Sequence, residues 1–102
     1  MSKERTAKPL PPVHPGILLR EDLDEAGSSL NQLARATRMP LSRISKIANG
    51  QRSITAETAL RLARYFGTSA EYWMNLQTHY DLELARQQSG SQIDEEVAAL
   101  AS

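Results

Sequence analysis

Residues 29–50 read SLNQLARATRMPLSRISKIANG, and this stretch decides the fold. Its first residue, a serine, offers a side-chain oxygen as a helix cap, and Gln32 follows three residues later, as in a capping box. Pro40 disfavours helical geometry at the residue before it and can itself open a helix. We therefore expect a short helix that ends near Arg38, a tight connection, and a second short helix over about 41–49.

Further helices are expected on both sides of this pair. Apolar residues recur at spacings near 3.6 ahead of Gly27, which supplies a left-handed stop. Thr55 and Ser69 offer N-cap oxygens before two more apolar helical patterns, and Gly67 ends the first of these. No stretch alternates with period two for long enough to predict a strand. The expected fold class is all-α, and its five helices cover about 16–26, 30–38, 41–49, 56–66 and 70–88.

Both ends of the chain are expected to lie outside the folded domain, which should span residues 14–88. Residues 1–13 combine charges with prolines, as a flexible arm does. The Ser-Gly-Ser run at 89–91 is typical of a linker. Residues 89–102 are expected to form a flexible or weakly helical tail, in which a short sixth helix is possible but marginal.

The charges of the chain are segregated, although their sum is zero. Residues 29–68 carry seven cations and one anion, a net charge of +6, whereas residues 1–28 carry −1 and residues 69–102 carry −5. No acidic residue occurs between positions 26 and 56. A cation-rich middle segment in an otherwise acidic chain is the pattern expected of a surface that binds a polyanion.

Two helices of about eight residues, joined by three or four residues, have the spacing of a helix-turn-helix, which places its second helix in the major groove of DNA. Periodicity turns Ile44, Ile47 and Ala48 of this second helix inward. Arginine and lysine can read guanine, and serine or asparagine can bond bases or backbone oxygens. An ordinary surface helix would mix glutamate with lysine, so the absence of carboxylates favours DNA binding. The residues left outward are Leu41, Ser42, Arg43, Ser45, Lys46 and Asn49.

The last expected helix carries more large apolar side chains than one helix of a 102-residue monomer readily buries. Trp73 is expected to seal the core within the chain. Specific DNA binding generally needs two half-sites, so a twofold homodimer is expected. The candidate dimerisation residues are Tyr72, Leu76, Tyr80 and Leu84.

Catalysis is not expected from this chain. It has no cysteine and only two histidines, His14 at a helix entry and His79 on an exposed helix turn. The His-Glu-x-x-His, glycine-rich phosphate-loop and nucleophile-elbow motifs are absent. The acidic run from Glu21 to Glu25 lies around one helix rather than in a loop with calcium spacing. We expect no enzyme activity, no cofactor and no metal.

A cytoplasmic location is the expected one. The chain starts with charged residues where a secretory signal needs an apolar run, and nowhere do 18 apolar residues occur together. A membrane partner is therefore not expected.

Five motifs carry a family resemblance: HPG at 14–16, NQLAR at 31–35, RISKIANG at 43–50, ITAETALRLARYFGTS at 54–69 and YWMNLQ at 72–77. With these motifs, the stretch from His14 to Arg86 resembles a HigA-type antitoxin, also called VapI-like, of the Xre helix-turn-helix family. The run over 54–77 is the most specific part of the resemblance. It implies a lambda-repressor-like fold.

The resemblance also implies a function and its residues. It implies a dimer that binds double-stranded operator DNA to repress its own operon, and that binds and neutralises a ribosome-dependent mRNA interferase toxin of the HigB/RelE type. Residues implied to lie at base edges are Ser42, Arg43 and Lys46, with Ser45 close by. The other members of the candidate DNA-binding set are Asn49, Arg52 and Ser29, which would face phosphates, and Arg38.

Two other functions remain open. The chain could be a stand-alone Xre-family transcriptional repressor without a toxin, or a toxin-binding module that does not contact DNA. A toxin that binds RNA must be basic, so acidic residues could dock it by charge complementarity. Those residues are Glu21, Asp22, Asp24, Glu25, Asp94, Glu95 and Glu96.

Overall fold

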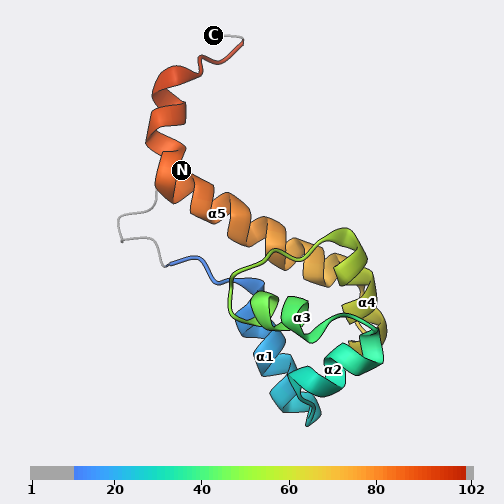
Figure 1. The fold of residues 1–102 in the computed structure, drawn as a ribbon. Coiled ribbons are helices and arrows are strands. Elements are labelled where there is room, and N and C mark those ends of the chain that lie inside the picture. Colours follow the sequence, from blue (N-terminus) through green and yellow to red (C-terminus); the bar gives the residue numbers. More distant parts are fainter. Residues whose placement is uncertain (1–10, 101–102) are drawn as a thin grey trace.

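The computed structural model describes residues 11–100 of the chain. This part contains five helices, joined by short loops, and no strand. They are α1 (Pro15–Ala26), α2 (Leu30–Thr37), α3 (Leu41–Ala48), α4 (Ala56–Phe66) and α5 (Ala70–Glu96). Figure 1 shows α1 to α4 gathered at one end of the molecule, while α5 runs past them and projects away. The all-α fold class is confirmed. Most of the expected N-terminal arm, residues 1–13, lies outside the described residues.

Local sequence signals set most of the helix ends. Ser29, Thr55 and Ser69 each accept a hydrogen bond from the backbone N–H three residues later, at 3.1, 3.4 and 3.1 Å. Gly27 and Gly67 follow α1 and α4 in the left-handed conformation, with φ of 66° and 74°. These predicted caps and stops are confirmed because each depends only on residues close in the chain.

One hydrophobic core lies between the helices, and α5 closes it with Trp73. The indole of Trp73 is fully buried, and its N–H donates to the hydroxyl of Thr68 at 3.0 Å. The expectation that Trp73 seals the core is therefore confirmed. The other large, fully buried apolar side chains are Leu19, Leu33, Ile44, Ile47 and Leu62. Across residues 11–100, no helix combines the length and the apolar character needed to span a membrane.

The start of α1 packs directly on the end of α3. A Cβ built at Gly16 would overlap the backbone oxygen of Ile47 and would lie 2.9 Å from the backbone oxygen of Ala48. Only glycine allows two backbones to approach this closely. The HPG motif therefore fixes where α3 ends relative to α1.

His14 holds the same junction from the side. Its Nδ1 accepts a hydrogen bond from the backbone N–H of Gly16 at 2.9 Å, so it is the N-cap of α1. Its ring meets that of Tyr80 edge to face, with centroids 4.9 Å apart. Burial lowers the pKa of His14, against smaller raising effects from Asp81 and the backbone of Arg52. The position at a helix entry was predicted, but the burial and the contact with α5 were not.

The helix α5 is longer than the sequence predicted. It is continuous from Ala70 to Glu96, so the linker expected at 89–91 and the separate sixth helix after it are both wrong. Gly90 is the only glycine in α5, and one glycine costs a helix interior only about 1 kcal/mol. Extending an existing helix avoids a new nucleation step, so this cost is tolerated.

Candidate nucleic-acid interface

The connection between α2 and α3 is a tight turn anchored in the core. Met39 is buried, and its N–H donates to the backbone oxygen of Ala34 at 3.1 Å. Arg38 ends α2 in the left-handed conformation, with φ of 58°. It is the one residue other than glycine with positive φ among residues 11–100. The turn therefore sets the angle between the two helices through short-range hydrogen bonds.

The outward face of α3 carries four of the candidate DNA-binding residues. Ile44, Ile47 and Ala48 are buried, so the rest of the helix is free to face a partner. Among the candidate residues there, Ser42 and Lys46 are exposed, and Arg43 and Ser45 are half-buried. The helix contains two cations and no carboxylate. This face can donate hydrogen bonds to base edges and phosphates without repelling them.

An arginine from α1 completes the end of α3, and sequence reasoning missed it. Nε of Arg20 donates to the backbone oxygen of Ala48 at 3.2 Å, and its other nitrogen donates to Oδ1 of Asn49. A cation at this end is favoured by the helix dipole. With Oδ1 of Asn49 accepting from Arg20, the amide nitrogen is the group that Asn49 can still offer to an acceptor. No local signal in α1 could have indicated this contact, because 28 residues separate Arg20 from Ala48.

The remaining candidate residues lie at the edges of this face. Ser29 is exposed and uses its oxygen as the N-cap of α2, which leaves its O–H to donate. Arg52 is exposed in the loop after α3. Arg38 is also exposed, and its left-handed backbone costs about 1 kcal/mol relative to glycine. The left-handed conformation lets Arg38 close α2, because the N–H groups of Arg38 and of the next residue donate to the carbonyls of Arg35 and Ala34.

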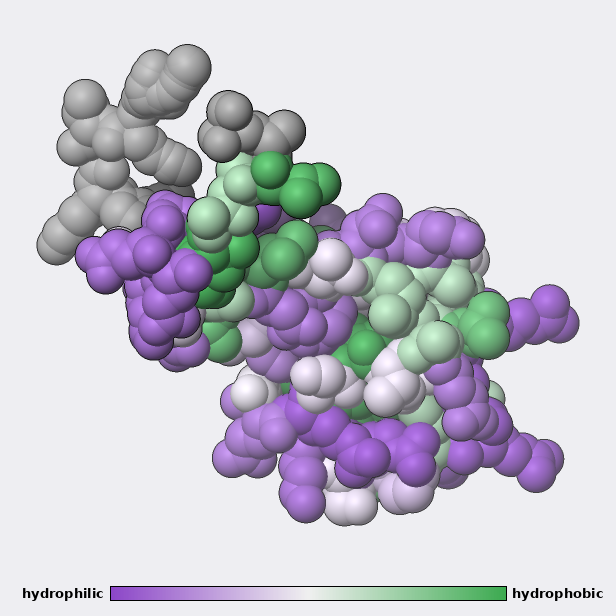
Figure 2. All heavy atoms as spheres, turned by 90° about the horizontal axis from the view of Figure 1, so that it is seen from above, coloured by the Kyte–Doolittle hydropathy of each residue, from purple (hydrophilic) through white to green (hydrophobic). Residues whose placement is uncertain are grey.

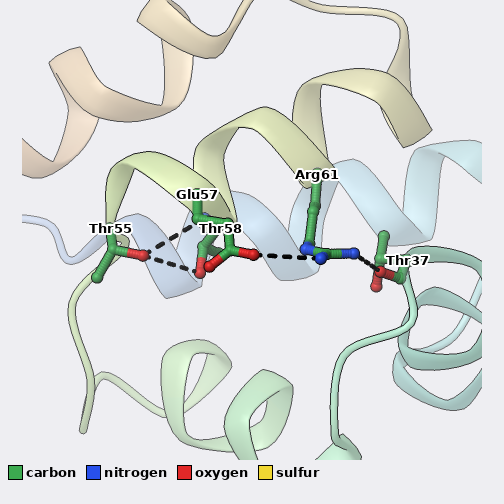
Figure 3. A network of polar contacts seen from close by, with 5 residues as sticks. All are labelled: Thr37, Thr55, Glu57, Thr58 and Arg61. Atoms are coloured by element: carbon green, nitrogen blue, oxygen red, sulfur yellow. Dashed lines mark hydrogen bonds and ion pairs between the residues drawn. The ribbon is translucent and has the colours of Figure 1, made fainter.

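The only anion of residues 29–68, Glu57, is paired with an arginine of the same helix. Arg61 of α4 donates to Glu57 at 3.2 Å and to the backbone oxygen of Thr37 at 2.8 Å (Figure 3). The same network contains the N-cap of α4, where the hydroxyls of Thr55 and Thr58 are 3.2 Å apart. It ties α4 to the end of α2.

A buried amide holds the loop that carries Arg52, and it was not predicted either. Oε1 of Gln77 accepts a hydrogen bond from the backbone N–H of Ile54 at 2.8 Å, and its nitrogen donates to Asp81 at 3.0 Å. Gln77 is only 4% exposed. This bond satisfies a loop N–H that would otherwise be buried without a partner.

The candidate dimerisation residues are partly used within the chain. Tyr72 and Leu76 pack against the core, and the hydroxyl of Tyr72 donates to Asp22 at 3.3 Å. Burial and the neighbouring carboxylates, Asp22 foremost, raise the pKa of Tyr72. Tyr80 contacts His14, and Leu84 is half-buried. Their role in a dimer stays a prediction.

Fold and site together define a helix-turn-helix domain, and residues 19–73 match the helix-turn-helix family model. The chain belongs to this family, in its Xre-type group of HigA-type and VapI-like proteins, as the sequence motifs indicated. Virulence-associated protein I of Dichelobacter nodosus is 51% identical over 83 residues, which cover 80% of this chain and 77% of that protein.

Two solved structures extend the similarity to the fold. An addiction module antidote protein of the HigA family from Coxiella burnetii has a TM-score of 0.84 and 48% identity, over 88% of this chain and 99% of that one. The Pseudomonas aeruginosa antitoxin HigA, solved with the higBA promoter, has a TM-score of 0.83 and 46% identity, over 87% of this chain and 98% of that one.

Proposed function

We propose that the chain is the antitoxin of a type II, HigBA-like toxin-antitoxin system. As a homodimer it binds operator DNA and represses its own operon. It also binds and neutralises a ribosome-dependent mRNA interferase toxin of the HigB/RelE type. It acts in the bacterial cytoplasm and is associated with the nucleoid while it is bound to DNA.

The observation that carries the proposal is the outward face of α3. Ser42, Arg43, Ser45 and Lys46 lie on a helix with no carboxylate, and a buried turn fixes that helix against α2. The similarity to the Pseudomonas aeruginosa HigA, which was solved with promoter DNA, supports the same use of this face. Ser42, Arg43 and Lys46 would read bases, with Ser45 beside them, whereas Asn49, Arg52, Ser29 and Arg38 would hold the DNA backbone.

Toxin binding is supported by the acidic side of α1. Glu21, Asp24 and Glu25 are exposed, and none of them pairs with a cation among residues 11–100. An RNA-binding toxin must be basic, so this face is complementary to it in charge. The cations of α3 are then free to stay on DNA.

Two measurements on the full chain test the proposal. The first is a gel shift with the DNA upstream of its own gene at several salt concentrations. The second is co-purification with the product of the neighbouring gene, together with rescue of growth when both are expressed. Retention of DNA without toxin binding would make the chain a stand-alone repressor, and toxin binding without DNA retention would make it a toxin-binding module only.

A further inference from the structure

A groove of about 420 Å³ lies between the end of α2 and the outer face of α4. Its centre is apolar, because Leu60 is 63% exposed, more than any other large hydrophobic residue of α1 to α4. Arg38, Arg61 and Arg64 surround it, against the single anion Glu57. An exposed leucine ringed by arginines is suited to an apolar segment that carries acidic residues.

Within the groove, one arginine is paired with the single carboxylate, and another is unpaired within the described part of the chain. Figure 3 shows the guanidinium of Arg61 between Glu57, on the same helix, and the end of α2, where it also donates to the backbone oxygen of Thr37. Arg61 is therefore a fixed part of the wall. Arg64 forms no ion pair among residues 11–100, so it is available to an incoming carboxylate, whereas Arg38 lies at the rim that faces the proposed DNA site.

The complementary segment is at the far end of the same chain. Ile93, Val97 and Leu100 are exposed, and Leu100 is wholly so. Ile93 and Val97 flank the three consecutive acidic residues at 94–96, and no cation follows Arg86. Figure 2 shows hydrophobic atoms gathered at this end of the molecule. Residues 93–100, called the tail from here on, are thus apolar and acidic, whereas the groove is apolar and basic.

A chain cannot seat its own tail in its own groove. The 27 residues of α5 form one helix, which at about 1.5 Å per residue is roughly 40 Å long. The helix starts four residues after the end of α4 and carries the tail away from it, so tail and groove lie at opposite ends (Figure 1). Only a second copy can bring a tail to the groove.

We propose that the groove between α2 and α4 binds the tail of a second copy of this chain, and that the two copies exchange tails reciprocally. The inference rests on the homodimer of the proposed function and adds the contact that completes it. Ile93 and Val97 cover Leu60, while the carboxylates of the tail meet Arg64 on α4. Such an exchange is isologous, as a twofold dimer requires.

Disulfide cross-linking tests the contact directly, because the chain has no cysteine. Leu60→Cys and Val97→Cys are prepared as separate full-length proteins, mixed, allowed to exchange subunits and oxidised. We expect a cross-linked dimer from the mixture and little from either variant alone. The matched control mixes Val97→Cys with Ile17→Cys, which is at a similarly exposed position on α1. Equal cross-linking in the control mixture, or none in the test mixture, would overturn the proposal.

A charge exchange gives an independent readout by sedimentation. Arg64→Glu should weaken dimerisation at least about fivefold by placing like charges together, and adding Glu95→Arg should restore most of the loss. Failure of the double variant to recover would overturn the proposal.

The wild-type result separates this inference from the proposed function. A dimeric wild type whose association is unchanged by Arg64→Glu refutes the tail contact alone. A wild type that stays monomeric at micromolar concentration refutes both the contact and the homodimer, whereas the gel shift reports on DNA binding separately. Protection of Leu60→Cys from a thiol reagent by operator DNA but not by dimerisation would assign the groove to DNA instead.

Discussion

Gly16→Ala gives the sharpest test of how α3 is positioned. Helix propensity alone predicts that alanine here stabilises the protein by up to about 1 kcal/mol. The added methyl group, however, would overlap the backbone oxygen of Ile47 and would crowd the carbonyl of Ala48 at 2.9 to 3.0 Å. Overpacking against a core costs about 1–3 kcal/mol, and here the obstacle is helix backbone that cannot rotate away. We therefore expect a net loss of about 2 kcal/mol, which lowers Tm by roughly 8–16 °C.

The assay is urea unfolding followed by the fluorescence of Trp73, the single and fully buried tryptophan. Protein concentration is held fixed because dimerisation would shift the apparent stability. The matched control is Gly90→Ala, since a Cβ at Gly90 meets nothing within 4 Å and should stabilise α5 by about 0.5–1 kcal/mol. If both substitutions stabilise the protein, α1 is not seated on the end of α3 and the account of the interface fails.

Four further single substitutions have expected outcomes. Burial lowers the pKa of His14, so the unfolded chain takes up the proton first, and the free energy of unfolding should fall as pH drops below about 6.5. In urea titrations, His14→Asn should remove this dependence of the unfolding free energy on pH, while His79→Asn should keep it. The same pH dependence in both variants would contradict the burial of His14. Gln77→Leu should cost about 1–3 kcal/mol of stability by stranding a buried N–H, and unchanged urea unfolding would show that the bond is unimportant. Arg38→Gly should add about 1 kcal/mol of stability yet weaken retention of upstream DNA in gel shifts, and a destabilised variant would argue against the strained backbone. Lys46→Ala should weaken DNA binding by about 1–3 kcal/mol and relax the base preference at one position of the operator. An unaltered base preference in a binding-site selection would show that Lys46 does not read a base.

The parts of the fold that follow from neighbouring residues could be predicted from the sequence. The oxygens of Ser29, Thr55 and Ser69 cap the helices that begin directly after them. The inward stripe of α3 follows from periodicity, so its outward residues followed by subtraction. These signals act within one helical turn and do not depend on the rest of the chain. The expected roles of the outward residues at base edges and phosphates came from the family resemblance.

The features that were missed or wrongly predicted depend on contacts between distant residues or on the cooperativity of helix formation. Arg20 reaches the end of α3 from 28 residues away, and Gln77 reaches Ile54 across 23 residues. His14 is buried in contact with Tyr80 of α5, which the sequence assigned to dimerisation alone. The run at 89–91 looked like a linker because propensity is local, whereas an established helix continues through one unfavourable residue.

A hydroxyl-radical footprint of the full chain on the DNA upstream of its own gene tests the central claim most directly. Two helices like α3, related by a twofold axis, should protect two patches about one helical turn apart, roughly 34–36 Å. The protection should weaken steeply between low and physiological salt because cations on this face release counterions from phosphate. A folded, dimeric protein that protects no part of this DNA at low salt would contradict the account.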